Sequence, residues 1–403
     1  MTPLYKINEI SDPSNHRGLT ITSSNGKLFN RVLNARLDKF LIKYNGIDEC
    51  QIEFRKKART SDHMFVLKTI IDKYCVAGNN KLYSCFVDFR KAYDTVIHTG
   101  IKLKLLDIGV GSLFYNIIKN MYSVSKSCIK VNNEISDSFL IKIGVKQGDN
   151  LRPNLFKNFI NDLPKYLQSF GDAVLLNDKP VNCLMYADDI VLLSTSPQGL
   201  QNKLDILKQY CNDWCLTVNT NKTKVLIFNK AGKHIKHTFN LIDTQLECVN
   251  RYKYLGIHFC ASGCFYFAQE ELYKKALKTY FKFSKDLLSL YPTIKTSMHV
   301  FNHTIKPIPC EVWGMFNPFT SKFRNTLLNF SRIFDKLPAE KLHQKFCKYI
   351  LRVHSKTSNT AVLSELGRFP IYFNIVQALV KYYYRLKNIL SDFPILHDAS
   401  EES

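Results

Sequence analysis

The sequence predicts an α+β fold in which helices cover one face of a β-sheet and a helical part follows. Through about the first 260 residues, short runs rich in β-branched and aromatic residues alternate with stretches of helical periodicity. Beyond about residue 262 the strand pattern fades while the helical pattern continues. The 403 residues, 45% of them hydrophobic, suffice for more than one core, so we expect two or three subdomains.

Apolar residues at helical spacing predict helices in both parts of the chain. Along 28–44, one face carries the apolar residues Leu28, Val32, Leu33, Leu37, Phe40 and Leu41, and the other carries Lys27, Arg31, Arg36, Lys39 and Lys43. A proline at position 153 favours a helix start at that point. The predicted helices are 28–44, 61–75, 100–123, 155–167, 197–215, 269–290, 342–351 and 371–390.

Five short apolar runs have the composition of β-strands. They cover 83–89, 181–186, 190–194, 225–229 and 254–259. The first carries Asp88 near its end, and the tight connection between the second and third contains Asp188 and Asp189. We therefore expect neighbouring strands to bring together carboxylates that are far apart in the sequence.

The charge balance favours a polyanionic partner. Lysine and arginine total 56 against 34 aspartates and glutamates, a formal net charge of +22. Displaced counterions drive phosphate binding, so nucleic acid is the first expectation and an anionic membrane surface the second. Against the membrane, every apolar run is far shorter than the roughly 20 residues that a span requires.

The first residues, MTPLYK, lack the apolar stretch of a secretion signal. We therefore expect an intracellular protein, in the nucleus or the cytoplasm, with no disulfide partner among its twelve cysteines. The closest pairs are Cys211/Cys215 and Cys260/Cys264, where a zinc site is the alternative to buried thiols.

Asp88, Asp188 and Asp189 have the chemistry of a site for hard divalent cations, which prefer carboxylate oxygens. Aspartate pairs also occupy hairpin turns simply because they tolerate turn dihedrals. An apolar strand that places a carboxylate at its end in both halves of the region is harder to explain in that way. We therefore expect two Mg²⁺ ions, with Mn²⁺ as a substitute, to bind these residues.

Five short motifs follow one another along the first two thirds of the chain. They are FVDFRKAYD at 86–94, GVKQGD at 144–149 with Leu151, Pro153 and Leu155-Phe156 after it, YADD at 186–189, Asn219 with KTK at 222–224, and YLGI at 254–257. In residues, order and spacing they resemble the reverse transcriptase of a non-LTR (LINE-type) retrotransposon, from 15–18 to about 259. The four residues of YADD alone would be a weak signal, but five ordered motifs are specific.

The resemblance implies a right-hand polymerase fold, with fingers, a palm built on an antiparallel sheet, and a helical thumb. Residues 1–260 would form fingers and palm, 261–330 a thumb-like helical region, and 331–403 a helical C-terminal region. The implied activity is RNA-directed DNA polymerisation, in which dNTPs extend the 3′-hydroxyl of a DNA primer on an RNA template. Along 269–290, five lysines would track the duplex backbone or simply face solvent: Lys274, Lys275, Lys278, Lys282 and Lys285.

The resemblance also assigns roles to single residues. Asp88, Asp188 and Asp189 would ligate the metal ions, and Lys222 would donate a proton to the pyrophosphate or offset its charge. Tyr93 would be the aromatic wall that excludes a 2′-hydroxyl. The residues that would contact nucleotide or template are Arg55, Lys56, Arg59, Phe89, Tyr93, Gln147, Gly148 and Tyr186. Judged without the motifs, Tyr93 is a core aromatic, Gly148 a loop glycine and Lys222 a solvated lysine.

Two positions depart from the family pattern. Arg152 stands where the family usually has serine, and Glu53 stands where it usually has glycine. The chain also opens inside the family's fingers with no endonuclease before it, which suggests an N-terminally truncated copy whose activity is impaired. The alternatives are therefore a catalytically inactive remnant that binds nucleic acid and an RNA-directed RNA polymerase, which Tyr93 disfavours.

Overall fold

The computed structural model describes residues 1–5, 9, 11–12, 15–53, 55–168, 172–290, 292–310, 337–389 and 393–402. Within it the chain falls into two units. The first comprises residues 1–63, 80–227 and 234–249, and the second comprises 64–79, 228–233 and 250–403. The ranges predicted for fingers and palm, thumb and C-terminal region divide the chain differently, and residues 311–336 within those ranges lie outside the described part.

A six-stranded sheet has the order β10-β11-β3-β12-β14-β13. The pairs β10/β11, β11/β3 and β13/β14 are antiparallel, whereas β12/β14 is parallel. Every residue of β3 is buried, which accounts for its continuous apolar run. The strands are β3 (Leu82–Val87), β10 (Cys183–Tyr186), β11 (Asp189–Ser194), β12 (Lys224–Phe228), β13 (Phe239–Leu241) and β14 (Thr244–Val249). The strands predicted at 83–89, 181–186, 190–194 and 225–229 are thus confirmed.

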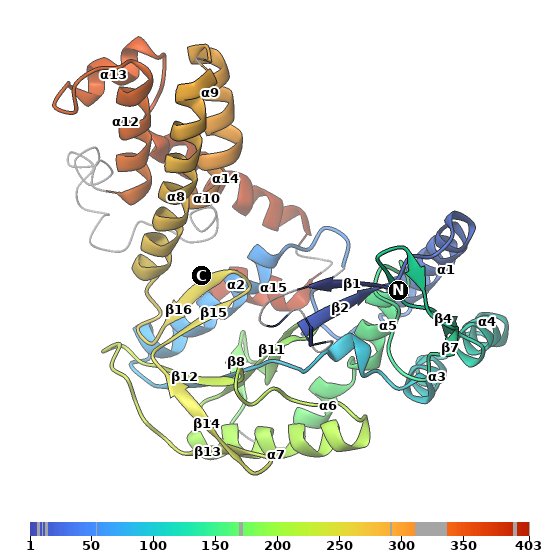
Figure 1. The fold of residues 1–403 in the computed structure, drawn as a ribbon. Coiled ribbons are helices and arrows are strands. Elements are labelled where there is room, and N and C mark those ends of the chain that lie inside the picture. Colours follow the sequence, from blue (N-terminus) through green and yellow to red (C-terminus); the bar gives the residue numbers. More distant parts are fainter. Residues whose placement is uncertain are drawn as a thin grey trace. The chain divides into compact units, whose positions relative to one another are not determined.

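The helix predicted at 197–215 is α7 (Pro197–Asp213), which packs against β3, β11 and β13 (Figure 1). It begins after Ser196, whose hydroxyl oxygen accepts a hydrogen bond from the Gly199 N–H at 2.9 Å. Its leucines at positions 200, 204 and 207 are fully buried, as their spacing requires. The helix predicted at 28–44 is α1 (Ser24–Lys43), which buries Leu33, Leu37 and Leu41. Leu28 and Val32, predicted on the same apolar face, are exposed.

Two predicted helices are each broken in two. The helix predicted at 100–123 is α3 (His98–Asp107) followed by α4 (Ser112–Ser123), because Gly109 adopts a φ of +75° between them. The helix predicted at 155–167 is α5 (Arg152–Phe159) followed by α6 (Leu163–Leu167), and Pro164 stands in the first turn of α6. The helical spacing of apolar residues continues across both breaks, so it predicts one helix where the structure has two.

Four small antiparallel hairpins complete the first unit. They pair β1 (Thr2–Tyr5) with β2 (His16–Leu19), β4 (Lys126–Ser127) with β7 (Phe139–Leu140), β5 (Lys130–Val131) with β6 (Glu134–Ile135), and β8 (Val174–Leu176) with β9 (Lys179–Val181). Helix α2 (Thr60–Ile71) continues into a π-helical turn at Asp72–Ala77, which together match the helix predicted at 61–75.

The second unit is mainly helical. Its hairpin of β15 (Arg251–Tyr254) and β16 (Ile257–Cys260) corrects the single strand predicted at 254–259, because Leu255 and Gly256 take φ values of +46° and +88° and reverse the chain. The helices are α8 (Tyr266–Leu290), α9 (Ile294–Val300) with a π-helical turn at Phe301–Ile305, α10 (Pro307–Cys310), α12 (Pro338–Ile350), α13 (Asn359–Glu365), α14 (Ile371–Ile389) and α15 (Pro394–Glu402). The helices predicted at 269–290, 342–351 and 371–390 are confirmed as α8, α12 and α14. The five lysines of α8 singled out above are exposed.

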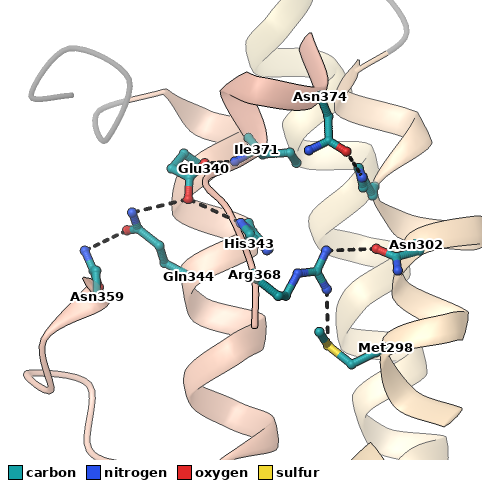
Figure 2. Close-up of polar contacts among 10 residues, drawn as sticks. Met298, Asn302, Glu340, His343, Gln344, Asn359, Arg368, Ile371 and Asn374 are labelled. Atoms are coloured by element: carbon teal, nitrogen blue, oxygen red, sulfur yellow. Dashed lines mark hydrogen bonds and ion pairs between the residues drawn. The ribbon is translucent and has the colours of Figure 1, made fainter. Parts of the chain in front are cut away.

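A buried carboxylate ties the C-terminal helices together (Figure 2). Glu340 on α12 is fully buried and accepts a hydrogen bond from the Ile371 N–H at the start of α14, at 2.5 Å. Its other oxygen lies 3.2 Å from the His343 ring and 3.5 Å from the Gln344 amide nitrogen. Nearby, the Arg368 guanidinium donates to the Asn302 side-chain oxygen at 2.8 Å. These contacts join α12, α14 and the segment after α9.

Within the part of the chain that the structure describes, no helix combines the length and the apolar character needed to cross a bilayer.

Candidate active site

Strand pairing brings the three predicted metal ligands together. Ile190 of β11 lies opposite Val87 of β3 in an antiparallel register. The next pair of positions is Asp189 and Asp88, so each carboxylate leaves its strand at the same end of the sheet. Asp188 precedes Asp189 in the hairpin turn between β10 and β11. The prediction that neighbouring strands join these carboxylates is confirmed.

The turn that carries Asp188 is hydrogen-bonded to the side chain of a buried glutamine. Tyr186 pairs with Asp189, which leaves Ala187 and Asp188 as a two-residue turn, and Ala187 takes a φ of +51°. The Ala187 N–H donates to the side-chain oxygen of Gln51 at 3.1 Å. Gln51 is fully buried, and we did not predict it as a site residue, because no periodicity or motif distinguishes it.

The segment around Gln51 acts as a short extra strand beside β10. The Met185 N–H donates to the Cys50 carbonyl at 2.8 Å, and the Ile52 N–H donates to the Met185 carbonyl at 3.1 Å. Glu53 comes directly after this paired segment, so it lies near the turn at 186–189.

The backbone of Asp88 is held by the turn that contains Lys222. The Asp88 N–H donates to the Thr223 hydroxyl at 3.1 Å, and the Asn219 N–H donates to the Asp88 carbonyl at 2.7 Å. The Thr223 N–H closes the turn on the Asn219 carbonyl at 2.8 Å. Lys222 is exposed on this turn. The fourth motif therefore supports the first through hydrogen bonds to the backbone of Asp88.

The carboxyl groups disturb one another's protonation. Partial burial, then Asp188 and Asp88, raise the pKa of Asp189 to about 6. Burial, then Asp188 and Asp189, raise the pKa of Glu53 to about 8, and Lys157 acts in the opposite direction. Lys157 is itself buried, and burial lowers its pKa to about 8. Glu53, noted above only as a departure from the family, is thus a fourth carboxyl at the site.

This arrangement fits a divalent cation. Ionised carboxylates are hydrogen-bond acceptors only, and like charges this close repel until a cation compensates them. Among the described residues, one carboxyl oxygen of Glu53 is buried without a hydrogen-bond partner. Hard cations such as Mg²⁺ take oxygen ligands of this kind, so Asp88, Asp188 and Asp189 offer suitable donors. Among the described residues, the group of three or more possible ligands whose atoms all lie within 4.8 Å of one another is His397, Asp398 and Glu401, so the three aspartate carboxylates are farther apart than that.

Tyr93 lies next to this acidic cluster, in a backbone that leaves it little freedom. The Val145 N–H donates to the Tyr93 carbonyl at 2.8 Å. Gly144 takes a φ of +87°, and a Cβ there would lie 2.8 Å from the Asp94 carbonyl oxygen, so only glycine fits. Burial, then Glu53 and Asp188, raise the pKa of the Tyr93 phenol.

Gln147 and Gly148 lie in a loop that is held by contacts with Thr20 and, through Asp149, with Asn30. The Thr20 N–H donates to the Gln147 carbonyl at 2.9 Å. Gly148 takes a φ of +99°, and a Cβ there would lie 2.9 Å from the Thr20 carbonyl oxygen. Glycine is therefore required by this close approach of Thr20, whatever the loop binds. The side chain of Asp149 accepts from the Asn30 amide at 2.9 Å and fixes the loop to α1.

The remaining predicted contact residues lie in several settings. Phe89 is only 5% exposed and pairs with Val218, so it belongs to the core below the carboxylates. Tyr186 is half-buried, with its ring 6.1 Å from that of His63. Lys56 is paired with Asp38 of α1 at 3.9 Å. Arg55 is half-buried and Arg59 exposed. Contacts of these residues with nucleotide or template remain predictions.

Comparison with known proteins gives one consistent family. The family model described as "Reverse transcriptase (RNA-dependent DNA polymerase)" matches residues 7–259. The chain is 29% identical over 260 residues to the "Probable RNA-directed DNA polymerase from transposon BS" of Drosophila melanogaster, covering 61% of this chain and 27% of that protein. It is 27% identical over 370 residues to the "Retrovirus-related Pol polyprotein from type-1 retrotransposable element R2" of Popillia japonica, covering 89% and 48%.

Among solved structures, the chain is similar to apo telomerase from Candida Tropicalis truncated from its C-terminal domain. The TM-score is 0.42 and the identity 14%, over 59% of this chain and 45% of that one. The chain spans about a quarter to a half of the length of the two curated relatives named above.

Proposed function

Because the chain belongs to the reverse transcriptase (RNA-dependent DNA polymerase) family, we propose that it is an RNA-directed DNA polymerase. The transposable-element relatives agree with the resemblance to a non-LTR retrotransposon enzyme. In the proposed reaction, the 3′-oxygen of a DNA primer attacks the α-phosphorus of a dNTP paired to an RNA template. The new P–O bond forms as the bond to the β-phosphate breaks, and pyrophosphate leaves.

One observation carries this proposal: the β3/β11 register brings Asp88 beside Asp188 and Asp189. We propose that these carboxylates hold two Mg²⁺ ions. When bound, such ions favour the ionised primer hydroxyl and offset the charge of the leaving pyrophosphate. The Gln51 side chain, bonded to the Ala187 N–H, and the Thr223 hydroxyl, bonded to the Asp88 N–H, would keep the carboxylates in place without substrate.

Other residues of the chain would position the substrates. We propose that Tyr93 lies under the sugar and excludes a 2′-hydroxyl, and that Gln147 and Gly148 face the nucleotide and the template. Lys222, exposed on the turn bonded to Asp88, would offset charge on the pyrophosphate or donate a proton to it. Arg55, Lys56 and Arg59 would contact phosphates.

Primer extension on an RNA template tests the proposal. Purified protein with Mg²⁺ and dNTPs should lengthen a labelled DNA primer, and Asp188→Asn should reduce the rate by at least about a hundredfold. Asp178→Asn is the matched control, because Asp178 is exposed in the β8–β9 turn of the same unit. If wild-type protein adds no nucleotides, or Asp188→Asn extends the primer as fast, the proposal is wrong.

A second function is favoured by the two unusual residues at the site. Glu53 adds a carboxyl beside Asp188 and Asp189, and Arg152 covers Tyr93, while the net charge of +22 suits nucleic-acid binding by itself. A chain of this kind would bind RNA or DNA without catalysis. Salt-dependent binding of primed RNA, with no incorporation in the assay above, would establish this function instead.

A further inference from the structure

Arg152 is the first residue of α5, and its side chain covers the ring of Tyr93. The guanidinium carbon lies 3.9 Å from the centre of that ring. Phe156, one helical turn later, has its ring centre 4.3 Å from that of Tyr93, with 33° between the planes. Residues four apart on a helix share a face, so one face of α5 contacts Tyr93 through two side chains.

The rest of Tyr93 is already fixed. Its carbonyl is bonded to the Val145 N–H, and the Gly144 N–H donates to the Val96 carbonyl at 2.7 Å just beyond it. With the backbone held on both sides, the ring can move only by turning its own side-chain torsions. Arg152 and Phe156 both contact the ring, so a turn of the ring must break or shift these two contacts.

We propose that Arg152 is a positioning residue that sets how strictly the site selects deoxyribonucleotides, because it holds the Tyr93 ring in place as the wall of the sugar pocket. The proposal rests on the proposed polymerase function and on the role given there to Tyr93. A wall that cannot turn aside excludes a 2′-hydroxyl more completely than one that can. Arg152 would therefore favour dNTPs over rNTPs without touching the sugar.

The chemistry of arginine suits this task. Its guanidinium is flat, weakly hydrated and always charged, so it stacks on an aromatic face. A lysine keeps the charge but presents a compact, strongly hydrated ammonium, and a serine is too short to reach the ring. We therefore expect selectivity to fall in the order wild type, Arg152→Lys, Arg152→Ser.

Single-nucleotide addition measures the selectivity directly. For each variant, kcat/KM is determined for dCTP and for CTP, which differ at the 2′ position alone, on the same primed RNA, and the ratio of the two is compared. Arg152→Ser should lower the ratio about two- to thirtyfold, the range available from a cation–aromatic contact. Arg36→Ser is the matched control, since Arg36 is exposed on α1, and it should leave the ratio unchanged. A ratio in active Arg152→Ser equal to that of wild type overturns the proposal.

A double-mutant cycle separates positioning from a general loss of structure. Tyr93→Ala alone should abolish most of the preference, and adding Arg152→Ser to it should then change the ratio no further. If Arg152→Ser lowers the ratio by the same factor with and without the Tyr93 ring, Arg152 acts independently of Tyr93 and the proposal fails. Arg152→Met keeps the length of the side chain and replaces Arg152→Ser if the latter does not fold.

An assay of nucleotide binding in which no nucleotide is added to the primer distinguishes this proposal from the proposed polymerase function. A chain-terminated primer on RNA is mixed with protein and either dCTP or CTP, and the stability of the ternary complex is measured by gel shift. Loss of the dCTP preference in Arg152→Ser supports the role of Arg152 even if the wild-type protein extends no primer. An unchanged preference in this assay counts against it.

Discussion

The guanidinium of Arg152 lies 3.9 Å from the centre of the Tyr93 ring, across 59 positions of sequence. Tyr93 is half-buried. Burial, and then the charges of Glu53 and Asp188, raise the pKa of its phenol. The residue at the start of α5 is thereby connected, through one aromatic ring, to the carboxylates at the ends of β3 and β11. Through this contact, position 152 reaches the candidate active site.

Divalent cations should stabilise the folded chain through the aspartates. The carboxylates repel one another, so an ion that binds only the folded state raises its stability, by about 2.7 kcal/mol at a hundred times the dissociation constant. We expect Mg²⁺ to raise the melting temperature of wild type and Asp178→Asn, and EDTA to reverse the effect. Asp88→Asn should show little response. An equal shift in all three proteins, measured by scanning calorimetry, would place the binding elsewhere.

Gly144 should tolerate no side chain. A methyl group there would lie 2.8 Å from the Asp94 carbonyl oxygen, and the φ of +87° is itself unfavourable for alanine. Gly109 is the matched control, because it has a φ of +75° but no atom within 4 Å of an added Cβ. In urea denaturation, Gly144→Ala should lose more stability than Gly109→Ala, and the difference measures the close approach. Equal losses would mean that only the φ matters.

His63 should make the fold sensitive to acid. It is fully buried, and burial lowers its pKa from 6.5 to about 3, so the folded state resists protonation that the unfolded state accepts. Its contribution to stability is complete above pH 6.5 and is lost as the pH falls from 6.5 towards 3. At pH 5 the loss relative to pH 8 is about 2 kcal/mol.

Replacing His63 by phenylalanine should remove that part of the pH dependence. His234→Phe, at an exposed position, should retain the wild-type pH profile. The measurement is the free energy of unfolding between pH 5 and pH 8 for the three proteins. Parallel profiles for wild type and His63→Phe would show that another group causes the acid sensitivity.

Glu340 should be important for the stability of the helical unit. Its carboxylate accepts the Ile371 N–H at 2.5 Å and lies 3.2 Å from His343, all in a buried setting (Figure 2). Glu340→Ala leaves these donors without their partner, which should cost at least about 3 kcal/mol. Glu365→Ala, at an exposed position on α13, should change stability little. Similar melting temperatures for the two variants would contradict this account.

Much of the fold was predictable because it depends on local pattern. Apolar spacing located α1, α7 and α14, and short continuous apolar runs located β3, β10 and β11. The predictions went wrong where one backbone angle changes direction within a continuous pattern. Gly109 divides a predicted helix, and Leu255 and Gly256 turn a predicted strand into a hairpin. Such breaks depend on the φ angle of a single residue. The spacing of apolar residues over a whole segment does not reveal that angle.

The sequence by itself determined the chemistry of Asp88, Asp188 and Asp189. A carboxylate at the end of an apolar strand and another pair in a hairpin turn are local features, and five ordered motifs name their family. Only the tertiary structure decided what surrounds them: Gln51 beneath the turn, Glu53 beside it, and Arg152 on Tyr93. Those contacts join residues tens to more than a hundred positions apart. They arise from strand order and helix packing, which leave no periodic trace in the residues that make them.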